Sequence, residues 1–467
     1  MKYVSTRGTA PALDFEDVLL AGLARDGGLY LPESWPRLSA ETIRSFAGKP
    51  FADIAVEIIH PFTGGAITRA ELQRMADDAY SCFGYSETVK LVPMYPGRYV
   101  LELFHGPTLA FKDVAMQLLA RLMDHVLEKR GRRATIIGAT SGDTGGAAIE
   151  AFRSSKRVDV VILFPDGRVS DVQRRMMTTP TESNVHAVAV KGTFDDCQAL
   201  VKAMFNDHAF RDRVHLSGVN SINWARIVSQ VSYYFAAAAN LGAPDQDVSF
   251  SVPTGNFGDI FAGYVARRMG LPIKQLIIAS NENDILPRTV ATGVYEMKGV
   301  VATSSPSMDI QISSNFERYL FEASGRNAGL IRGFMKDLTD KKRFELGPLW
   351  SILKSDFAAA TASEHDVAEA IRAAKQRHGY GIDPHTACGV VAANRVGGSG
   401  DMVVLATAHP AKFPDAIEAI TGARPHLPER LANLMTNPER FDVIANDLHA
   451  VEAYVERSLS AGKKAHA

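Results

Sequence analysis

The chain has few cysteines and no long apolar segment. Its three cysteines, Cys82, Cys197 and Cys388, are far apart and odd in number, which argues against a disulfide framework and against a CxxC metal site. No apolar run reaches the roughly 18 residues that a membrane span requires, and the N-terminus lacks an apolar signal segment. We therefore expect a cytoplasmic protein with reduced cysteines and no bound metal.

The chain also lacks an excess of charge of either sign. It has 51 basic and 52 acidic side chains, a net charge of −1 and no long run of one sign. This balance predicts neither nucleic-acid nor membrane binding, so any anion site must be local. With 467 residues, of which 46% are hydrophobic, the chain is typical of an enzyme of two or three domains. We expect a small-molecule substrate and a monomer or homodimer.

The pattern of apolar residues predicts three domains. Residues 1–92 form a small, mostly helical domain that ends at the segment 93–97, which contains two prolines and a glycine. Short β-branched runs then alternate with helical periods, as in parallel sheets covered by helices. We predict an α/β fold with domains at residues 93–215 and 216–467, the latter with a helical insertion at 305–380. The predicted strands are 134–138, 158–164, 185–190, 214–219, 248–252, 273–278 and 402–405.

Lys112 is the most informative single residue. It lies beside Phe111, Leu109 and Val114, and desolvation by such neighbours lowers the pKa of a lysine amine and makes it a nucleophile suited to a Schiff base. The alternative is a surface lysine whose stem lies along apolar neighbours.

Two glycine-bearing loops and one hydroxyl follow predicted strands, at the edge where parallel sheets bind ligands. The loop 138–146 offers backbone amides at a helix start and could hold a carboxylate. It lacks the Lys-Ser or Lys-Thr pair of a P-loop and the GxGxxG spacing of dinucleotide sites. The loop 253–259 could hold a phosphate monoester in the same way. Thr407, after the strand 402–405, could direct its hydroxyl into the same crevice. Each loop could also be only a capped helix start.

A reactive lysine, a phosphate loop, a carboxylate loop and a hydroxyl together match the needs of pyridoxal phosphate and an amino-acid substrate. The chain resembles the fold-type II (tryptophan synthase β-like) pyridoxal phosphate enzymes and, among them, the long bacterial and fungal threonine synthases. The N-terminal motifs discriminate this family from related dehydratases and cysteine synthases, which share only the lysine and the glycine loops. The matching segments are 3–8, 26–32, 104–113, 141–146, 253–263 and 407–413.

The resemblance implies a role for each site residue. Lys112 would form the Schiff base, and the hydroxyl of Thr407 would bond the pyridine nitrogen without holding it protonated, which leaves the ring a weaker electron sink. The phosphate of the cofactor would lie along Gly255, Asn256, Phe257 and Asp259, and the substrate carboxylate would bind Ser141, Gly142, Asp143 and Thr144. An acid beside a carboxylate is repulsive, so we expect Asp143 to cap its helix instead.

The resemblance also implies the reaction, in which O-phospho-L-homoserine and water give L-threonine and phosphate in threonine biosynthesis. The departing phosphate needs a second anion site, for which Asn315 and Arg318 are candidates because a guanidinium binds phosphate bidentately. Arg318 could instead be a helix-surface cation paired with Glu317 or Glu322. The alternative functions are a threonine or serine dehydratase, a catalytically silent binding paralogue and, more distantly, a nicotinamide oxidoreductase.

Overall fold

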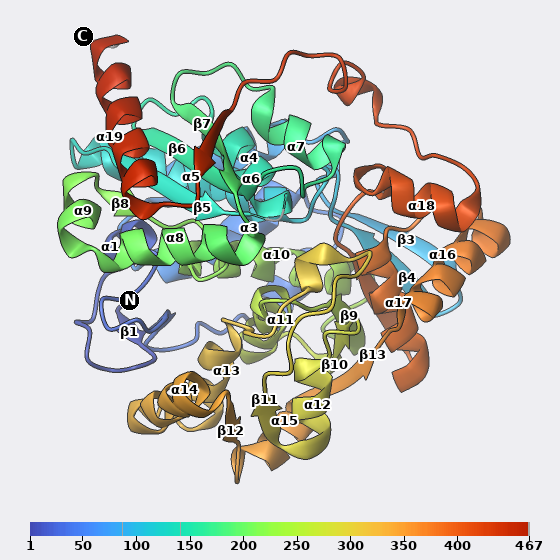
Figure 1. Cartoon of the computed structure of the whole chain (residues 1–467). Coiled ribbons are helices and arrows are strands. Elements are labelled where there is room, and N and C mark those ends of the chain that lie inside the picture. The colour runs from blue at the N-terminus through green and yellow to red at the C-terminus, as the bar shows by residue number, and fades with distance from the viewer. Residues whose placement is uncertain (86, 141, 466–467) are drawn as a thin grey trace.

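Two parallel sheets form the framework of the molecule (Figure 1). The structure is a computed structural model that describes residues 1–85, 87–140 and 142–465, with side chains described up to residue 459. The smaller sheet has the strand order β15-β7-β6-β5-β8, and all its neighbouring strands are parallel. Its strands are β5 (Ala134–Ala139), β6 (Val158–Pro165), β7 (Val185–Lys191), β8 (Leu216–Ser217) and β15 (Asp442–Ala445).

The larger sheet has six strands in the order β13-β10-β9-β14-β4-β3. Only β3 is antiparallel to its neighbour. Its strands are β3 (Lys90–Tyr95), β4 (Arg98–Glu102), β9 (Val248–Pro253), β10 (Ile273–Ser280), β13 (Phe357–Thr361) and β14 (Asp401–Ala406). The central strands β9 and β10 are almost wholly buried, as expected where helices cover both faces of a parallel sheet.

Helices cover both sheets. The smaller unit contains α5 (Lys112–Lys129), which precedes β5, and α6 (Asp143–Phe152), α7 (Asp171–Thr178), α8 (Phe194–Asn206) and α9 (His208–Arg213), with α19 (Leu448–Ala465) against α8. The larger unit contains α10 (Trp224–Asn240), α11 (Gly258–Arg268), α12 (Ile285–Thr292), α13 (Phe316–Ala323), α14 (Ala328–Lys341), α15 (Leu349–Asp356), α16 (Glu364–His378), α17 (Pro384–Val396) and α18 (Pro414–Thr421). None of the described helices is both long and apolar enough to cross a membrane.

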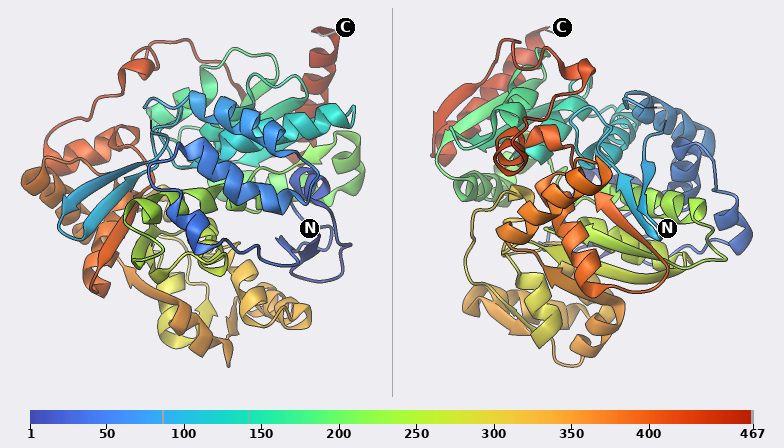
Figure 2. Two further views of the ribbon diagram at one scale, coloured as in Figure 1. Left: turned by 180° about the vertical axis from the view of Figure 1, so that it is seen from behind. Right: turned by 90° about the vertical axis from the view of Figure 1, so that its right-hand side faces the viewer.

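The N-terminal segment packs against the back of both units, as the left view of Figure 2 shows in blue. It contains the hairpin β1 (Tyr3–Ser5) and β2 (Tyr30–Pro32) and the helices α1 (Phe15–Ala21), α2 (Ala40–Arg44), α3 (Phe51–Ile59) and α4 (Arg69–Ser81). Helix α3 lies on α10, and α4 lies on α5. The expected mostly helical character of this segment agrees with the structure.

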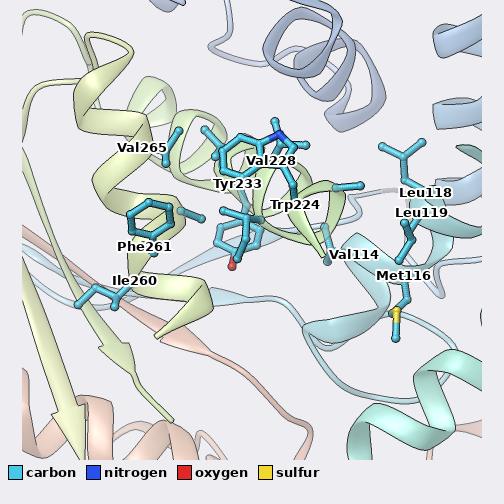
Figure 3. Close-up of a cluster of buried hydrophobic side chains, with 14 of the residues drawn as sticks. Val114, Met116, Leu118, Leu119, Trp224, Val228, Tyr233, Ile260, Phe261 and Val265 are labelled. Carbon is cyan, nitrogen blue, oxygen red and sulfur yellow. The ribbon is translucent and has the colours of Figure 1, made fainter. Parts of the chain in front are cut away.

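One apolar core joins the N-terminal segment to the two units. Figure 3 shows side chains of α5, α10 and α11 in one cluster around Trp224, whose side chain is fully buried. Helix α10 is buried along nearly its whole length and therefore lies in the interior, where it packs against both units. Helices α5 and α11, which carry or follow predicted site residues, are therefore packed into this core.

The observed units differ from the predicted domain boundaries in two places. Strand β4 belongs to the larger sheet although it lies within the predicted smaller domain, because it pairs in parallel with β14. Strand β15, near the C-terminus, adds to the edge of the smaller sheet through β7. In addition, the segment 305–380 is not a purely helical insertion, since β13 pairs with β10 in the main sheet and a short strand, β12 (Arg343–Glu345), pairs with β11 (Val294–Glu296).

Candidate active site

Lys112 is the first residue of α5, and only 8% of its surface is exposed. The residues before it are held by the segment after β14: the Phe111 N–H donates to the Thr407 carbonyl (2.9 Å), and the His409 N–H donates to the Leu109 carbonyl (3.0 Å). These bonds bring two predicted site residues, Lys112 and Thr407, to one place from opposite ends of the sequence. The Thr407 hydroxyl has no hydrogen-bond partner among the described residues.

The Lys112 amine lies in a buried ionic group that we call the lysine cluster: Lys112, Asp143 and Lys412. The Nζ atom of Lys112 lies 3.1 Å from Asp143 Oδ2, and the Nζ atom of Lys412 lies 2.6 Å from Asp143 Oδ1. Lys412 also donates to the Thr108 carbonyl at 2.9 Å, and its surface is 1% exposed. One carboxylate is thus shared between two lysines that come from different segments.

The environment of the cluster lowers the pKa of both Lys112 and Asp143. Burial lowers the pKa of Lys112, and the positive charge of Lys412 lowers it further, while Asp143 acts in the opposite sense. Burial alone would raise the pKa of Asp143, but the two lysines hold it well below its usual range. The cluster therefore favours an ionised Asp143 beside an amine that gives up its proton readily, as expected for Lys112 from its apolar neighbours.

Further polar groups hold the Asp143 carboxylate from the other side. The Ser307 hydroxyl donates to Oδ2 (3.1 Å), and the Gln173 side-chain amide donates to Oδ1 (2.9 Å). The Ser307 N–H donates to Nε2 of His385 (3.2 Å), so the imidazole carries its proton on Nδ1, which lies 2.7 Å from Asp383. Four side chains therefore contact the Asp143 carboxylate: Lys112, Lys412, Gln173 and Ser307.

The expectation that Asp143 caps its helix is wrong. Within the described residues, no side chain caps helix α6 at its N-cap residue, Gly142, and the Asp143 carboxylate contacts other side chains. The hydroxyl of Thr140 instead accepts from the N–H groups of Gly142 and Gly145, both at 2.9 Å. The repulsion that Asp143 would exert on a carboxylate is offset by its two lysines.

The predicted carboxylate loop does present free donors. The N–H groups of Asp143 and Thr144 have no acceptor in the described part of the chain, and they stand at the positive end of α6. Gly142 has φ +137°, and a Cβ atom there would lie 2.5 Å from the Gln173 carboxamide, so only glycine fits. Ser141, which we also expected in this loop, lies outside the described residues.

The predicted phosphate loop has the same property. It follows β9, and the N–H groups of Gly255, Asn256 and Phe257 have no acceptor among the described residues. Helix α11 begins directly after it without a side-chain cap. A Cβ atom on Gly255 would lie 2.7 Å from the Ser307 carbonyl, so this loop lies directly against the residue that also bonds Asp143.

Asp259 does not point its carboxylate at that loop's free amides. Its Oδ1 accepts from the hydroxyls of Tyr233 and Tyr234, while its buried Oδ2 has no partner among the residues that the structure describes. Burial raises the pKa of Asp259 to about 6, against the opposing effect of the tyrosine hydrogen bonds. The side chain thus anchors α11 to α10, and we assign no phosphate contact to it.

The expectation that Asn315 and Arg318 bind substrate phosphate is not supported by their positions. Arg318 is fully buried, and its guanidinium donates to the carbonyls of Tyr30, Ser221 and Ile222 and to Asn315. The amide nitrogen of Asn315 donates to the Asn256 carbonyl at 3.1 Å. Because these donors already bond protein carbonyls and the Asn315 side chain, we infer that Arg318 and Asn315 stabilise the phosphate loop and do not bind the phosphate itself.

A second buried arginine, Arg226, was not predicted as a site residue. It lies in the first turn of α10 with 3% of its surface exposed, and among the described residues its side chain makes one hydrogen bond, from Nη1 to the Val219 carbonyl (3.2 Å). Its Nε atom has no partner in the described part of the chain. Burial lowers its pKa to about 10, and its charge contributes to the lowered pKa of Lys112. Arg226 is therefore a buried cation near the lysine with an unused donor.

The residues present fit the expected cofactor, pyridoxal phosphate. Its phosphate needs several N–H donors without competing acceptors, which the 255–257 loop supplies. Its aldehyde needs an amine of lowered pKa, and its ring nitrogen accepts from a neutral hydroxyl; Lys112 and Thr407 meet these needs.

Comparisons with known proteins agree with this site. Three family descriptions match in order along the chain: "Threonine synthase N terminus" over residues 2–80, "Pyridoxal-phosphate dependent enzyme" over 98–337, and "Threonine synthase, C-terminal" over 386–455. The chain is 50% identical to the threonine synthase of Pseudomonas aeruginosa over 99% of its length and 100% of that protein.

Two solved structures are similar over nearly the whole chain. The crystal structure of pyridoxal phosphate-bound threonine synthase from Brucella melitensis has a TM-score of 0.95 and 59% identity, with 98% of this chain and 99% of that one covered. The crystal structure of threonine synthase from yeast has a TM-score of 0.92 and 38% identity, with the same shares covered.

Proposed function

We propose a substrate and residue roles for this chain, which belongs to the threonine synthase family and forms threonine as a pyridoxal phosphate-dependent lyase. The substrate is O-phospho-L-homoserine, which reacts with water to give L-threonine and phosphate. The single observation that carries the proposal is the lysine cluster, in which a buried amine of lowered pKa contacts Asp143, the first residue of α6, while Ser307 joins Asp143 to the loop 255–257.

Each anionic group of cofactor and substrate has a set of donors. The amides of Gly255, Asn256 and Phe257 hold the cofactor phosphate, and the hydroxyl of Thr407 meets the ring nitrogen. The amides of Asp143 and Thr144 bind the substrate carboxylate. In the role first expected of Arg318, Arg226 binds the phosphate of the substrate, because its buried Nε atom lacks a partner among the described residues. When bound, the cofactor supplies an electron-withdrawing ring conjugated with the substrate amino group.

Lys112 moves the protons of the reaction. Its neutral amine accepts the proton from Cα, and the same nitrogen transfers protons at the neighbouring carbon as phosphate leaves Cγ and water adds to Cβ. This role requires an amine that can lose its proton inside the protein. Lys412 makes this possible, because its ammonium group neutralises Asp143 and no uncompensated carboxylate remains when Lys112 is neutral.

Products distinguish this function from its alternatives. Purified protein reconstituted with pyridoxal phosphate is incubated with O-phospho-L-homoserine, and phosphate, threonine and ammonia are measured. We expect equal amounts of phosphate and threonine and no ammonia. Ammonia with a keto acid would instead indicate a dehydratase, and substrate binding without phosphate release would indicate a silent paralogue.

The oligomeric state and the cellular location are two further parts of the proposal. The small-molecule substrate requires no macromolecular partner, so we propose a monomer or homodimer. We also propose a cytoplasmic location, which agrees with three cysteines that form no disulfide within the described residues.

A further inference from the structure

A cavity of about 590 Å³ lies beside the segments that precede Lys112 and follow Thr407, since Leu109 and His409 line it. It is bounded by the hairpin β3–β4, helix α16 and the segment after α18, elements that lie together on the right of Figure 1. Neither the members of the lysine cluster nor residues 255–259 line it. Its volume is within the range of roughly 300–1,000 Å³ that is typical of small-molecule sites.

The rim of this cavity carries uncompensated positive charge. Three cations, Lys90, Lys375 and Arg430, line it, and we call them the rim cations. No carboxylate of the described residues lies within ion-pair distance of any of them. The guanidinium of Arg430 donates only to backbone carbonyls. A fourth lining cation, Arg424, is already paired with carboxylates outside the cavity.

The carboxylate that lines this cavity, Glu102, already has hydrogen-bond partners. Glu102 is the one carboxylate among the lining residues described, and it is buried. One of its oxygens lies 2.7 Å from Nε2 of His105, and the other accepts from the Tyr380 hydroxyl at 2.6 Å. The charge of Glu102 interacts with that of Lys90, but among the described residues Glu102 forms no ion pair with any of the three rim cations. An anion that enters the cavity would neutralise the remaining positive charge.

The floor of the cavity is apolar. It consists of side chains that are at least nine-tenths buried: Phe104, Leu109, Ile371, Ile382 and Ile417. An inorganic anion would leave this surface in contact with water, whereas a molecule with an apolar body would cover it. Cations at the rim and an apolar floor together favour an amphipathic anion.

We propose that this cavity binds a small organic anion, with an apolar ring against the floor and a carboxylate, sulfonate or phosphate group at the rim cations. The site is distinct from that of the proposed substrate. It is connected to the segment that carries Lys112, because Arg430 Nη2 donates to the carbonyls of His105 (3.2 Å) and Gly106 (2.6 Å).

The test uses the fluorescent sulfonate 8-anilinonaphthalene-1-sulfonate as a probe of the holoprotein. We expect saturable binding of one equivalent that weakens at high salt. The double variant Lys90→Met/Lys375→Met, in which both changed residues are exposed, should bind the sulfonate about tenfold more weakly. The uncharged analogue N-phenyl-1-naphthylamine should bind both proteins equally. Lys202→Met, which replaces an exposed lysine of α8 outside the cavity, serves as the matched control and should bind like the unchanged protein.

Three results would overturn the proposal. The first is the absence of saturable binding, and the second is equal affinity of the double variant and the unchanged protein for the sulfonate. The third is displacement of the probe by O-phospho-L-homoserine, which would place the probe at the lysine cluster. Because binding is read without turnover, the first two results are independent of whether the proposed reaction occurs.

Discussion

At the scale of single residues, the Asp143 carboxylate is shared by two lysines and raises the pKa that burial lowers in Lys112. It is the only carboxylate of the described residues paired with Lys112, and it is shared with Lys412. A buried pair of one lysine and one carboxylate would stabilise the protonated form of the amine. A second lysine can neutralise the carboxylate, so the first lysine can lose its proton without leaving a buried, uncompensated charge. Lys412 is therefore a positioning residue that acts on Lys112 through Asp143.

Replacement of Lys412 should test this division of charge. In Lys412→Met, Asp143 has only Lys112 to neutralise it, so the pKa of the Lys112 amine rises. We expect the acid limb of the pH profile of kcat/KM to move upward by about one unit or more, with a parallel shift in the pH dependence of the cofactor absorbance.

Controls for this prediction come from conservative and remote changes. Lys412→Arg keeps the charge and should restore much of the profile, and Lys202→Met should leave it unchanged. A Lys412→Met protein with lower activity but an unshifted profile would show that Lys412 has only a structural role.

Asp259 provides a second prediction at this scale. Its pKa is raised to about 6 in the folded protein and is about 3.9 in the unfolded chain. The folded state therefore binds more protons between these values, and the stability that this carboxyl contributes at low pH is lost as the pH rises from about 4 to 6.

The change Asp259→Asn should remove this contribution. The difference in unfolding free energy between the two proteins should shift by roughly 2 kcal/mol in favour of the variant between pH 4 and pH 7, measured by urea unfolding. A difference that does not vary with pH would contradict the raised pKa.

At the scale of elements, the site is built from loops that follow β5, β9 and β14. These loops and Lys112 could be predicted from the sequence, because glycines, a hydroxyl and a lysine followed strands or lay among apolar residues. The partners of Asp143 could not be predicted, since Ser307, His385 and Lys412 are distant in sequence and no local pattern marks their contact. Lys412 lies within a matching segment, 407–413, which was the one available signal.

The turn between β5 and α6 gives a prediction at this scale. In Gly142→Ala, the new Cβ atom would collide with Gln173, and the alanine would have to adopt an unfavourable φ. We therefore expect a loss of about 2–4 kcal/mol in stability and a higher KM for the substrate. Gly131→Ala has a positive φ but an open surrounding and should cost only about 1–2 kcal/mol without a change in KM. Equal effects of the two changes on KM would contradict the role of this turn.

At the scale of the whole molecule, segments from both ends of the chain complete units that begin elsewhere. Arg318 joins the N-terminal segment, through Tyr30, to the segment before α10, and β15 closes the smaller sheet from the C-terminal side. Such pairings join segments that are distant in sequence, so local patterns of apolar residues, proline and glycine could not predict that β4 and β15 belong to these sheets. The alternation of strands and helices was sufficient to predict the α/β class.

Two buried arginines separate support of the fold from substrate binding. Arg318→Met removes donors to three carbonyls, and we expect a loss of roughly 3 kcal/mol or more in unfolding free energy with an unchanged KM at low temperature. Arg226→Met removes a buried cation with an unused donor, so KM should rise at least about tenfold while stability falls little. A higher KM in Arg318→Met together with an unchanged KM in Arg226→Met would contradict this account and assign the substrate phosphate to Arg318.

The most direct test of the account is to identify the lysine that holds the cofactor, since the structure brings two buried lysines to one carboxylate. The protein loaded with pyridoxal phosphate is reduced with borohydride and digested, and the modified peptide is sequenced by mass spectrometry. The account predicts the reduced cofactor on Lys112 alone. Modification of Lys412 instead would contradict the assignment of every role in the lysine cluster.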